Sequence, residues 1–117
     1  MDSVPVVTLK VHVEKGEQAE LEQFLISFAS AREFSVTDRS RESGLAGGRR
    51  VSAFRFTRTD GITMGLGDYM DGKRFWVAIY DDRETHAWHD LYRELETQLK
   101  SRWPDTVIEH GPAGGEP

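Results

Sequence analysis

The 117-residue chain contains no cysteine. This absence excludes disulfide bonds, thiolate chemistry and zinc sites that use sulfur. The chain also lacks an apolar run near the roughly 18 residues of a membrane-spanning helix, and its start, MDSVPVV, is neither basic nor apolar enough for a secretory leader. We therefore expect a soluble, cytoplasmic protein without membrane contact, although an exported form that begins after a removed leader would show the same sequence.

Positive charge is also scarce, because the formal net charge is −5 at pH 7. An acidic chain is not generally attracted to nucleic acid, so we expect no nucleic-acid partner. The exception is the segment 39–50, RSRESGLAGGRR, whose four arginines and one glutamate sum to +3 and leave −8 for the rest. This basic, glycine-rich segment could contact an anion or a partner, or it could be a solvated connection between strands.

Hydrophobic spacing predicts a single α+β domain over residues 1–110. Alternation over residues 6–13 predicts a half-buried strand, and apolar residues three and four apart predict amphipathic helices over 17–32 and about 84–103. The region 49–81 is rich in β-forming residues and predicts a three-stranded meander.

The predicted order is β-α-β-β-β-β-α, with a short strand near residues 34–38 preceding the meander. This order favours an antiparallel sheet with two amphipathic helices packed on one face, a ferredoxin-like two-layer sandwich. Residues 105–110 could add a final edge strand, and residues 111–117 are expected to form a disordered tail.

Two Asp-Gly pairs, at residues 60–61 and 71–72, fall between the strands of the meander. Asp-Gly is a strong signal for a hairpin with a two-residue loop. If both loops have two residues, counting outward from each turn fixes which residues lie opposite one another. The predicted pairs are Phe56 with Gly65, Phe54 with Gly67, Gly67 with Trp76, Gly65 with Ala78 and Thr63 with Tyr80.

This register sorts the side chains of the meander onto two faces. One face is aliphatic and suits a core beneath helices, but Arg55 falls on it and fits poorly there unless its strand lies near an edge. The other face gathers aromatic and arginine side chains around Gly65 and Gly67, a composition typical of protein interfaces. The candidate partner-binding residues on it are Phe54, Phe56, Arg58, Tyr69, Arg74, Trp76 and Tyr80.

The aromatic face has two further interpretations that the sequence leaves open. Its rings could fold over the glycines and shield the sheet backbone, which stabilises such strands without any partner. Alternatively, the aromatic face could be the one beneath the helices, with the aliphatic face outside.

The segment 81–92, DDRETHAWHDLY, concentrates carboxylates and histidines. A metal site needs three or four convergent ligands, and the expected helix places His86 and His89 on its solvent side. Asp81 followed by Glu84 is instead typical of a capping box at a helix start. The sequence therefore predicts a helix start here and no metal site.

The sequence contains no motif that specifies a reaction. We therefore predict a non-catalytic module without a cofactor, which recognises another protein or a second copy of itself, so that a homodimer is possible. An acidic inhibitor or immunity-type protein is one form of this prediction. The alternative is a small-ligand-binding domain or small enzyme that uses the aromatic face as a pocket. A platform for single-stranded nucleic acid is disfavoured by the negative charge.

Overall fold

The computed structural model describes residues 4–42, 49–83 and 87–110 of the chain. These residues form an α+β fold, as the hydrophobic spacing predicts, with two helices and a six-stranded sheet whose neighbouring strands pair antiparallel. The elements are β1 (Val7–His12), α1 (Gln18–Ser30), β2 (Ser35–Asp38), β3 (Arg41–Glu42), β4 (Arg50–Val51), β5 (Phe54–Thr57), β6 (Ile62–Asp68), β7 (Arg74–Asp81), α2 (Trp88–Arg102) and β8 (Val107–His110).

The strand order in the sheet is β2-β5-β6-β7-β1-β8, and β3 pairs with β4 in a short separate ribbon. A ferredoxin-like unit has the chain order β-α-β-β-α-β. Here the β5–β6 hairpin lies between β2 and β7, so the sheet is wider than that unit and the ferredoxin-like order is not confirmed. The predicted final edge strand is present as β8, which pairs with β1.

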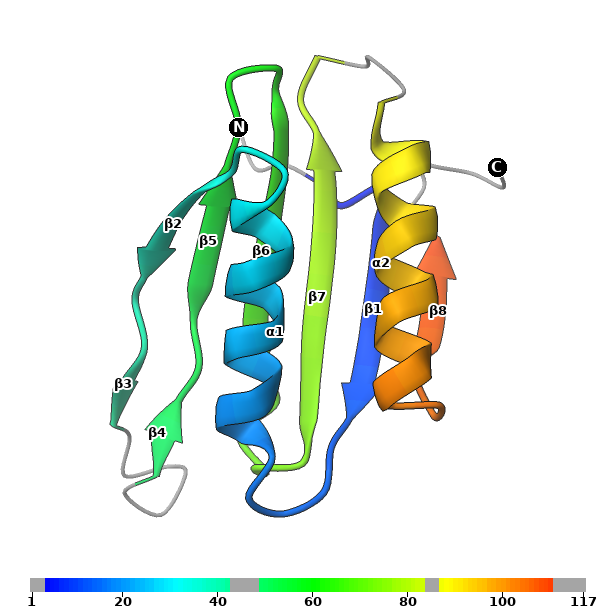
Figure 1. The fold of residues 1–117 in the computed structure, drawn as a ribbon. Coiled ribbons are helices and arrows are strands. Elements are labelled where there is room, and N and C mark those ends of the chain that lie inside the picture. Colours follow the sequence, from blue (N-terminus) through cyan, green and yellow to red (C-terminus); the bar gives the residue numbers. More distant parts are fainter. Residues whose placement is uncertain (1–3, 43–48, 84–86, 111–117) are drawn as a thin grey trace.

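Both helices lie on the same side of the sheet (Figure 1). Their apolar stripes pack against the sheet in one continuous core, because side chains three and four residues apart share one face of a helix. Buried residues of this core include Leu21, Leu25 and Phe28 from α1, Leu91, Leu95 and Leu99 from α2, and Leu9, Met64 and Val77 from the sheet. Among the described residues, no helix covers the other side, which we call the open face.

The second hairpin of the meander has the predicted register. Gly67 lies opposite Trp76 across β6 and β7. The Asp71 carboxylate holds the turn, because it accepts hydrogen bonds from the backbone N–H groups of Lys73 and Arg74 at 2.9 and 2.8 Å. The count from the Asp71-Gly72 pair therefore places β7 correctly.

The first hairpin has a register that differs by one residue from the predicted one. Arg55 pairs with Gly65, and Phe56 pairs with Met64. A two-residue loop would place Phe56 opposite Gly65 instead. The predicted register of β5 is therefore wrong.

The cause lies in the turn between β5 and β6. The last pair before the turn is Thr57 with Thr63, so the connection spans residues 58–62 instead of two residues. Within this turn the Gly61 N–H donates to the Arg58 carbonyl at 3.4 Å, and Arg58 forms an ion pair with Asp60 at 2.8 Å. The Asp-Gly pair is thus part of a longer loop with an odd number of residues.

A shift of one residue moves every side chain of a strand to the opposite face of the sheet. Phe54 and Phe56 therefore lie in the core beneath the helices, where they are 6% and 0% exposed and their rings stack 6.1 Å apart. Arg55 lies on the open face, between the two phenylalanines in sequence. The prediction that Phe54 and Phe56 face the aromatic side is wrong.

The prediction for the segment 81–92 is also wrong in part. Asp81 is the last residue of β7, and α2 begins at Trp88 after Ala87, whose side chain makes no capping hydrogen bond. The helix predicted over about 84–103 therefore begins later, at Trp88, and Asp81 is the end of a strand instead of the cap of this helix. His89 is half-buried, and its ring stacks on Trp88 at 3.8 Å between centroids.

Some predictions fall outside the described residues: Glu84 of the capping box, His86 and the tail 111–117. In the described part of the chain, no helix is both long enough and apolar enough to cross a membrane.

Candidate functional site

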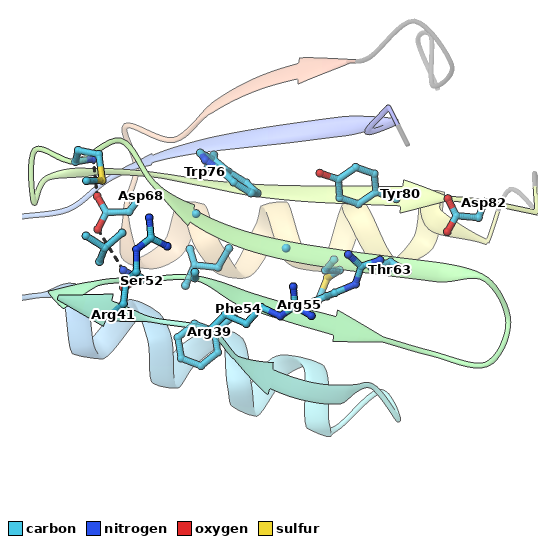
Figure 2. Close-up of a pocket in the computed structure, with 17 residues that line it drawn as sticks. Arg39, Arg41, Ser52, Phe54, Arg55, Thr63, Asp68, Trp76, Tyr80 and Asp82 are labelled. Carbon is cyan, nitrogen blue, oxygen red and sulfur yellow. Dashed lines mark hydrogen bonds between the residues drawn. The ribbon is translucent and has the colours of Figure 1, made fainter. Parts of the chain in front are cut away.

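The open face carries a hollow of about 600 Å³ over the middle strands of the sheet (Figure 2). Strand β6 forms its floor with Thr63, Gly65 and Gly67, all of which are buried. The two glycines remove side chains from the centre of the floor. The hollow exists because alternate residues of β6 place Met64 and Leu66 in the core and these small residues on the other side.

Trp76 lies across the floor of the hollow. A Cβ atom added at Gly67 would lie 2.0 Å from the indole ring, and one added at Gly65 would lie 3.4 Å from it. The ring therefore covers the backbone at Gly67, as expected if aromatic residues shield strand glycines. Trp76 nevertheless stays half-buried and lines the hollow, so part of the indole remains accessible.

Tyr80 completes one side of the hollow. It lies four residues after Trp76 on β7, and the small buried residue Ala78 lies between them on the same face. Figure 2 shows both rings along β7, on one side of β6. We call Trp76 and Tyr80 the aromatic wall.

Three arginines lie on the other side of the hollow, and we call them the arginine wall. Arg55 comes from β5, whereas Arg39 and Arg41 come from the outer segment that continues β2 into β3. All three are exposed. Within the described residues, none of their side chains forms an ion pair or hydrogen bond with another side chain. The hollow thus has two chemically different sides, one aromatic and one cationic, and the carboxylate of Asp82 lies at its end beyond Tyr80 (Figure 2).

The remaining arginines of the basic segment point elsewhere. Arg49 donates to both carboxylate oxygens of Asp68, at 3.0 and 3.1 Å. Asp68 has a side chain with 0% exposure, and it also accepts the backbone N–H groups of Ser52 and Met70 at 3.3 and 2.7 Å. This buried carboxylate is therefore fully satisfied, and Asp68 lies at one end of the hollow.

Arg50 is held by the first turns of α1. Its guanidinium donates to Glu22 at 3.0 Å and to Asp38 at 3.2 Å, and these contacts raise the pKa of Arg50. Ser52 donates its hydroxyl to Glu22, and Gln18 donates to the Ser52 hydroxyl at 2.7 Å. This polar network anchors the basic segment to α1, and the positive charge of Arg50 is balanced by two carboxylates.

A lysine on the far side of the aromatic wall is also paired with a carboxylate. Lys10 lies opposite Trp76 in the pairing of β1 with β7. Its ammonium group donates to Glu109 at 2.8 Å, and this hydrogen bond raises the pKa of Lys10. Free positive charge on this part of the open face therefore gathers at the arginine wall.

The structure separates the residues that the sequence predicted as one site. Trp76 and Tyr80 line the hollow, whereas Phe54 and Phe56 are buried in the core, and of these two only Phe54 also borders the hollow. Tyr69 and Arg74 share the open face but lie beyond the hollow, beside the second turn. There the Arg74 guanidinium lies 5.6 Å from the Tyr69 ring centroid and pairs with Asp71 at 2.6 Å.

Arg58 lies away from the hollow at the first turn. Its guanidinium pairs with Asp60, lowering the pKa of that carboxyl, and it lies 4.6 Å from the centroid of the Phe34 ring. The placement of Arg58 on the aromatic face is therefore wrong, for the same reason as for Phe54 and Phe56.

The predicted site residues do not include the arginine wall, although Arg39 and Arg41 belong to the basic segment 39–50, which the sequence indicates as a possible contact for an anion or a partner. The signal that could have found Arg55 is the run Phe54-Arg55-Phe56, because a charged residue between two large apolar ones belongs on the solvent side of a strand. Arg39 and Arg41 join the site through the pairing of β2 with β5, a contact between distant segments that no local pattern indicates.

The described residues contain no group of three or more histidine, aspartate or glutamate side chains arranged to hold a metal ion. Comparisons with protein-family models, curated proteins and solved structures find no significant match for the chain. Function must therefore be inferred from the hollow itself.

Proposed function

We propose that this chain is a non-catalytic recognition module that binds another protein through the hollow on its open face. The observation that supports this proposal is the opposition of an aromatic wall to an arginine wall across a glycine floor. Tryptophan, tyrosine and arginine are the residues enriched in interface hot spots, because each buries a large area and keeps a polar group for hydrogen bonding.

The charge of the arginine wall favours an acidic surface on the partner, because complementary charges steer association and exclude wrong partners. The rest of the chain is acidic, with a net charge of −5 overall. An inhibitor or immunity-type role is compatible with this proposal if the target presents an acidic region to the hollow. Binding to a uniformly basic target is less favoured, because the arginine wall would repel it.

Affinity capture from a native lysate tests this proposal when the same bait is compared with two variants. Trp76→Ala and Tyr80→Ala remove the aromatic wall, and each should reduce the recovery of a specifically bound protein by about tenfold or more, because hot-spot truncations commonly cost this much. Arg93→Ala, on the exposed surface of α2, is the control and should not change recovery.

The outcome that contradicts the proposal is a captured protein whose recovery is equal for all four baits. Light scattering of the purified chain shows whether the partner is a second copy. In that case Trp76→Ala should convert the dimer to a monomer while Arg93→Ala should leave it intact.

The volume of the hollow supports a second candidate function. A volume of about 600 Å³ falls within the range of small-molecule sites, and an arginine could grip a carboxylate or phosphate there. A thermal-shift screen with anionic metabolites distinguishes this candidate, because a ligand that binds the native state raises the melting temperature as its concentration rises. Arg55→Gln should abolish such a shift.

A further inference from the structure

The arginine wall has three positions at successive levels along the hollow. Arg55 is level with Ala78, because both pair with the same residue of β6. Arg39 comes next, since its backbone N–H donates at 2.7 Å to the carbonyl of Ala53, two residues before Arg55. Arg41 follows two residues later on the outer segment. All three line the hollow, and side chains two residues apart in an extended ligand, roughly 6.6 Å from each other, could reach successive arginines.

These three arginines differ from most others in the described part of the chain. Arg32, Arg49, Arg50, Arg58, Arg74 and Arg102 each form an ion pair with a carboxylate. The three side chains of the arginine wall form none with the described residues, although the chain has more acidic than basic groups. Three arginines grouped on one side of the hollow give that side a positive potential that attracts an anionic group of a partner.

The aromatic wall places its two rings at separate positions along the hollow. Trp76 and Tyr80 are separated by the small side chain of Ala78, which is 2% exposed. Ala78 is not among the residues that line the hollow, so the surface that this wall offers is the two rings themselves, on residues that lie roughly 13 Å apart along β7. The two walls therefore offer alternating contacts to an extended chain that runs along β6.

We propose that the hollow binds an extended segment of a partner protein in which acidic residues alternate with apolar ones. In an extended chain, successive side chains point in opposite directions. The acidic side chains then point to the arginine wall, where each carboxylate can accept two hydrogen bonds from one guanidinium. The apolar side chains point to the aromatic wall, against the rings of Trp76 and Tyr80. This inference rests on the proposed protein-recognition function and specifies the chemistry of the partner.

Binding of two labelled peptides to the full chain at physiological ionic strength tests the inference. In one peptide aspartates alternate with leucines, and in the other the same residues are arranged with all aspartates together. We expect the alternating peptide to bind about tenfold more tightly, because only its carboxylates match the spacing of the arginines. Equal affinity for the two peptides would overturn the inference.

Two charge-matched variants locate the binding. Arg39→Glu with Arg41→Glu should weaken binding of the alternating peptide by about a hundredfold, since two charge-assisted contacts become repulsive. Arg93→Glu with Lys100→Glu changes the net charge equally on the exposed surface of α2 and should leave the affinity within about twofold. Equal losses in both variants would overturn the inference in favour of non-specific charge attraction. Circular dichroism confirms that both variants are folded.

Two further results separate this inference from the proposed function. A captured partner whose binding requires Trp76 but tolerates Arg39→Glu with Arg41→Glu would overturn the acidic-segment inference and leave protein recognition intact. A single-stranded oligonucleotide that binds more tightly than the alternating peptide would overturn both, because the hollow would then recognise nucleic acid.

Discussion

The basic segment contains two pairs of arginines that the fold uses in different ways. Arg49 and Arg50 reach carboxylates on β6 and α1 and become part of a polar network. Arg39 and Arg41, a few residues earlier, lie on the open face and meet no carboxylate among the described residues. Ion pairing within the chain, and not the number of charges in a segment, therefore distinguishes structural arginines from those available to a partner.

The largest effect should follow from breaking the buried pair of Asp68 with Arg49. Asp68→Ala leaves Arg49 without a carboxylate partner, although it keeps the Gln18 and Arg50 oxygens, and leaves two backbone N–H groups without an acceptor. We expect a loss of about 3 kcal/mol in the free energy of unfolding, measured by urea denaturation, because removing one member of a buried pair is strongly destabilising. Asp105→Ala, at an exposed position, is the control. Similar losses in the two variants would show that Asp68 is not structural.

Glu22→Gln should have a smaller effect on the same network. The substitution keeps the shape of the side chain but removes the charge that Arg50 and the Ser52 hydroxyl contact. A hydrogen bond to a charged group contributes about 1.5–3 kcal/mol, and we expect a loss near the lower value because the Arg50 side chain is half-exposed. Glu20→Gln, on the exposed surface of α1, should change the unfolding free energy less. An equal loss at both positions would contradict the network.

Gly67→Ala tests the floor of the hollow. The added methyl group would meet the Trp76 indole, which must then move away. We expect a loss of about 1 kcal/mol in stability, together with a change in the NMR signal of the Trp76 indole N–H. Gly65→Ala is the matched control, because its methyl group would touch the ring at 3.4 Å without the same overlap. An unchanged indole signal in Gly67→Ala would contradict the position of Trp76.

A pH titration tests another arginine that forms an ion pair within the chain, Arg74, whose partner is Asp71. Hydrogen bonds from Arg74 lower the pKa of Asp71, so in acid the folded chain binds fewer protons than the unfolded chain. This contribution to stability is present above the unfolded pKa of about 3.9 and is lost as the pH falls through the lower folded value. Asp71→Asn should therefore flatten the fall of melting temperature below about pH 4. An unchanged slope would count against the pair.

The smallest effect on stability is expected at the arginine wall. Arg39→Gln with Arg41→Gln removes no ion pair between described residues, and surface changes of this kind usually alter stability by less than about 0.5 kcal/mol. Urea denaturation should therefore give nearly the same unfolding free energy as for the unmodified chain. A loss above about 1 kcal/mol would show that these arginines are structural.

Much of the fold follows from local patterns in the sequence. The apolar stripe of Leu21, Leu25 and Phe28 predicts α1 because the helical period is local, and alternation predicts β1 for the same reason. The register of β7 follows from the Asp71-Gly72 turn, because the observed pairs of β6 with β7 are those that a two-residue loop gives.

The rest of the site depends on features that local patterns do not specify. The turn at Asp60-Gly61 contains an odd number of residues, and this single difference exchanges Phe54 and Phe56 for Arg55 on the open face. Arg39 and Arg41 join the hollow only because β2 pairs with β5 after a long connection. The sequence predicts the correct face for Trp76 and Tyr80, because their strand follows the Asp71-Gly72 turn, whose register agrees with the prediction.

The pairing of Arg55 with Gly65 is the feature on which both walls of the hollow depend, and NMR measures it without any partner. Cross-strand nuclear Overhauser effects should connect the backbone protons of Arg55 with those of Gly65, and those of Phe54 with those of Leu66. Effects that connect Phe56 with Gly65 would contradict this register, returning both phenylalanines to the open face and Arg55 to the core.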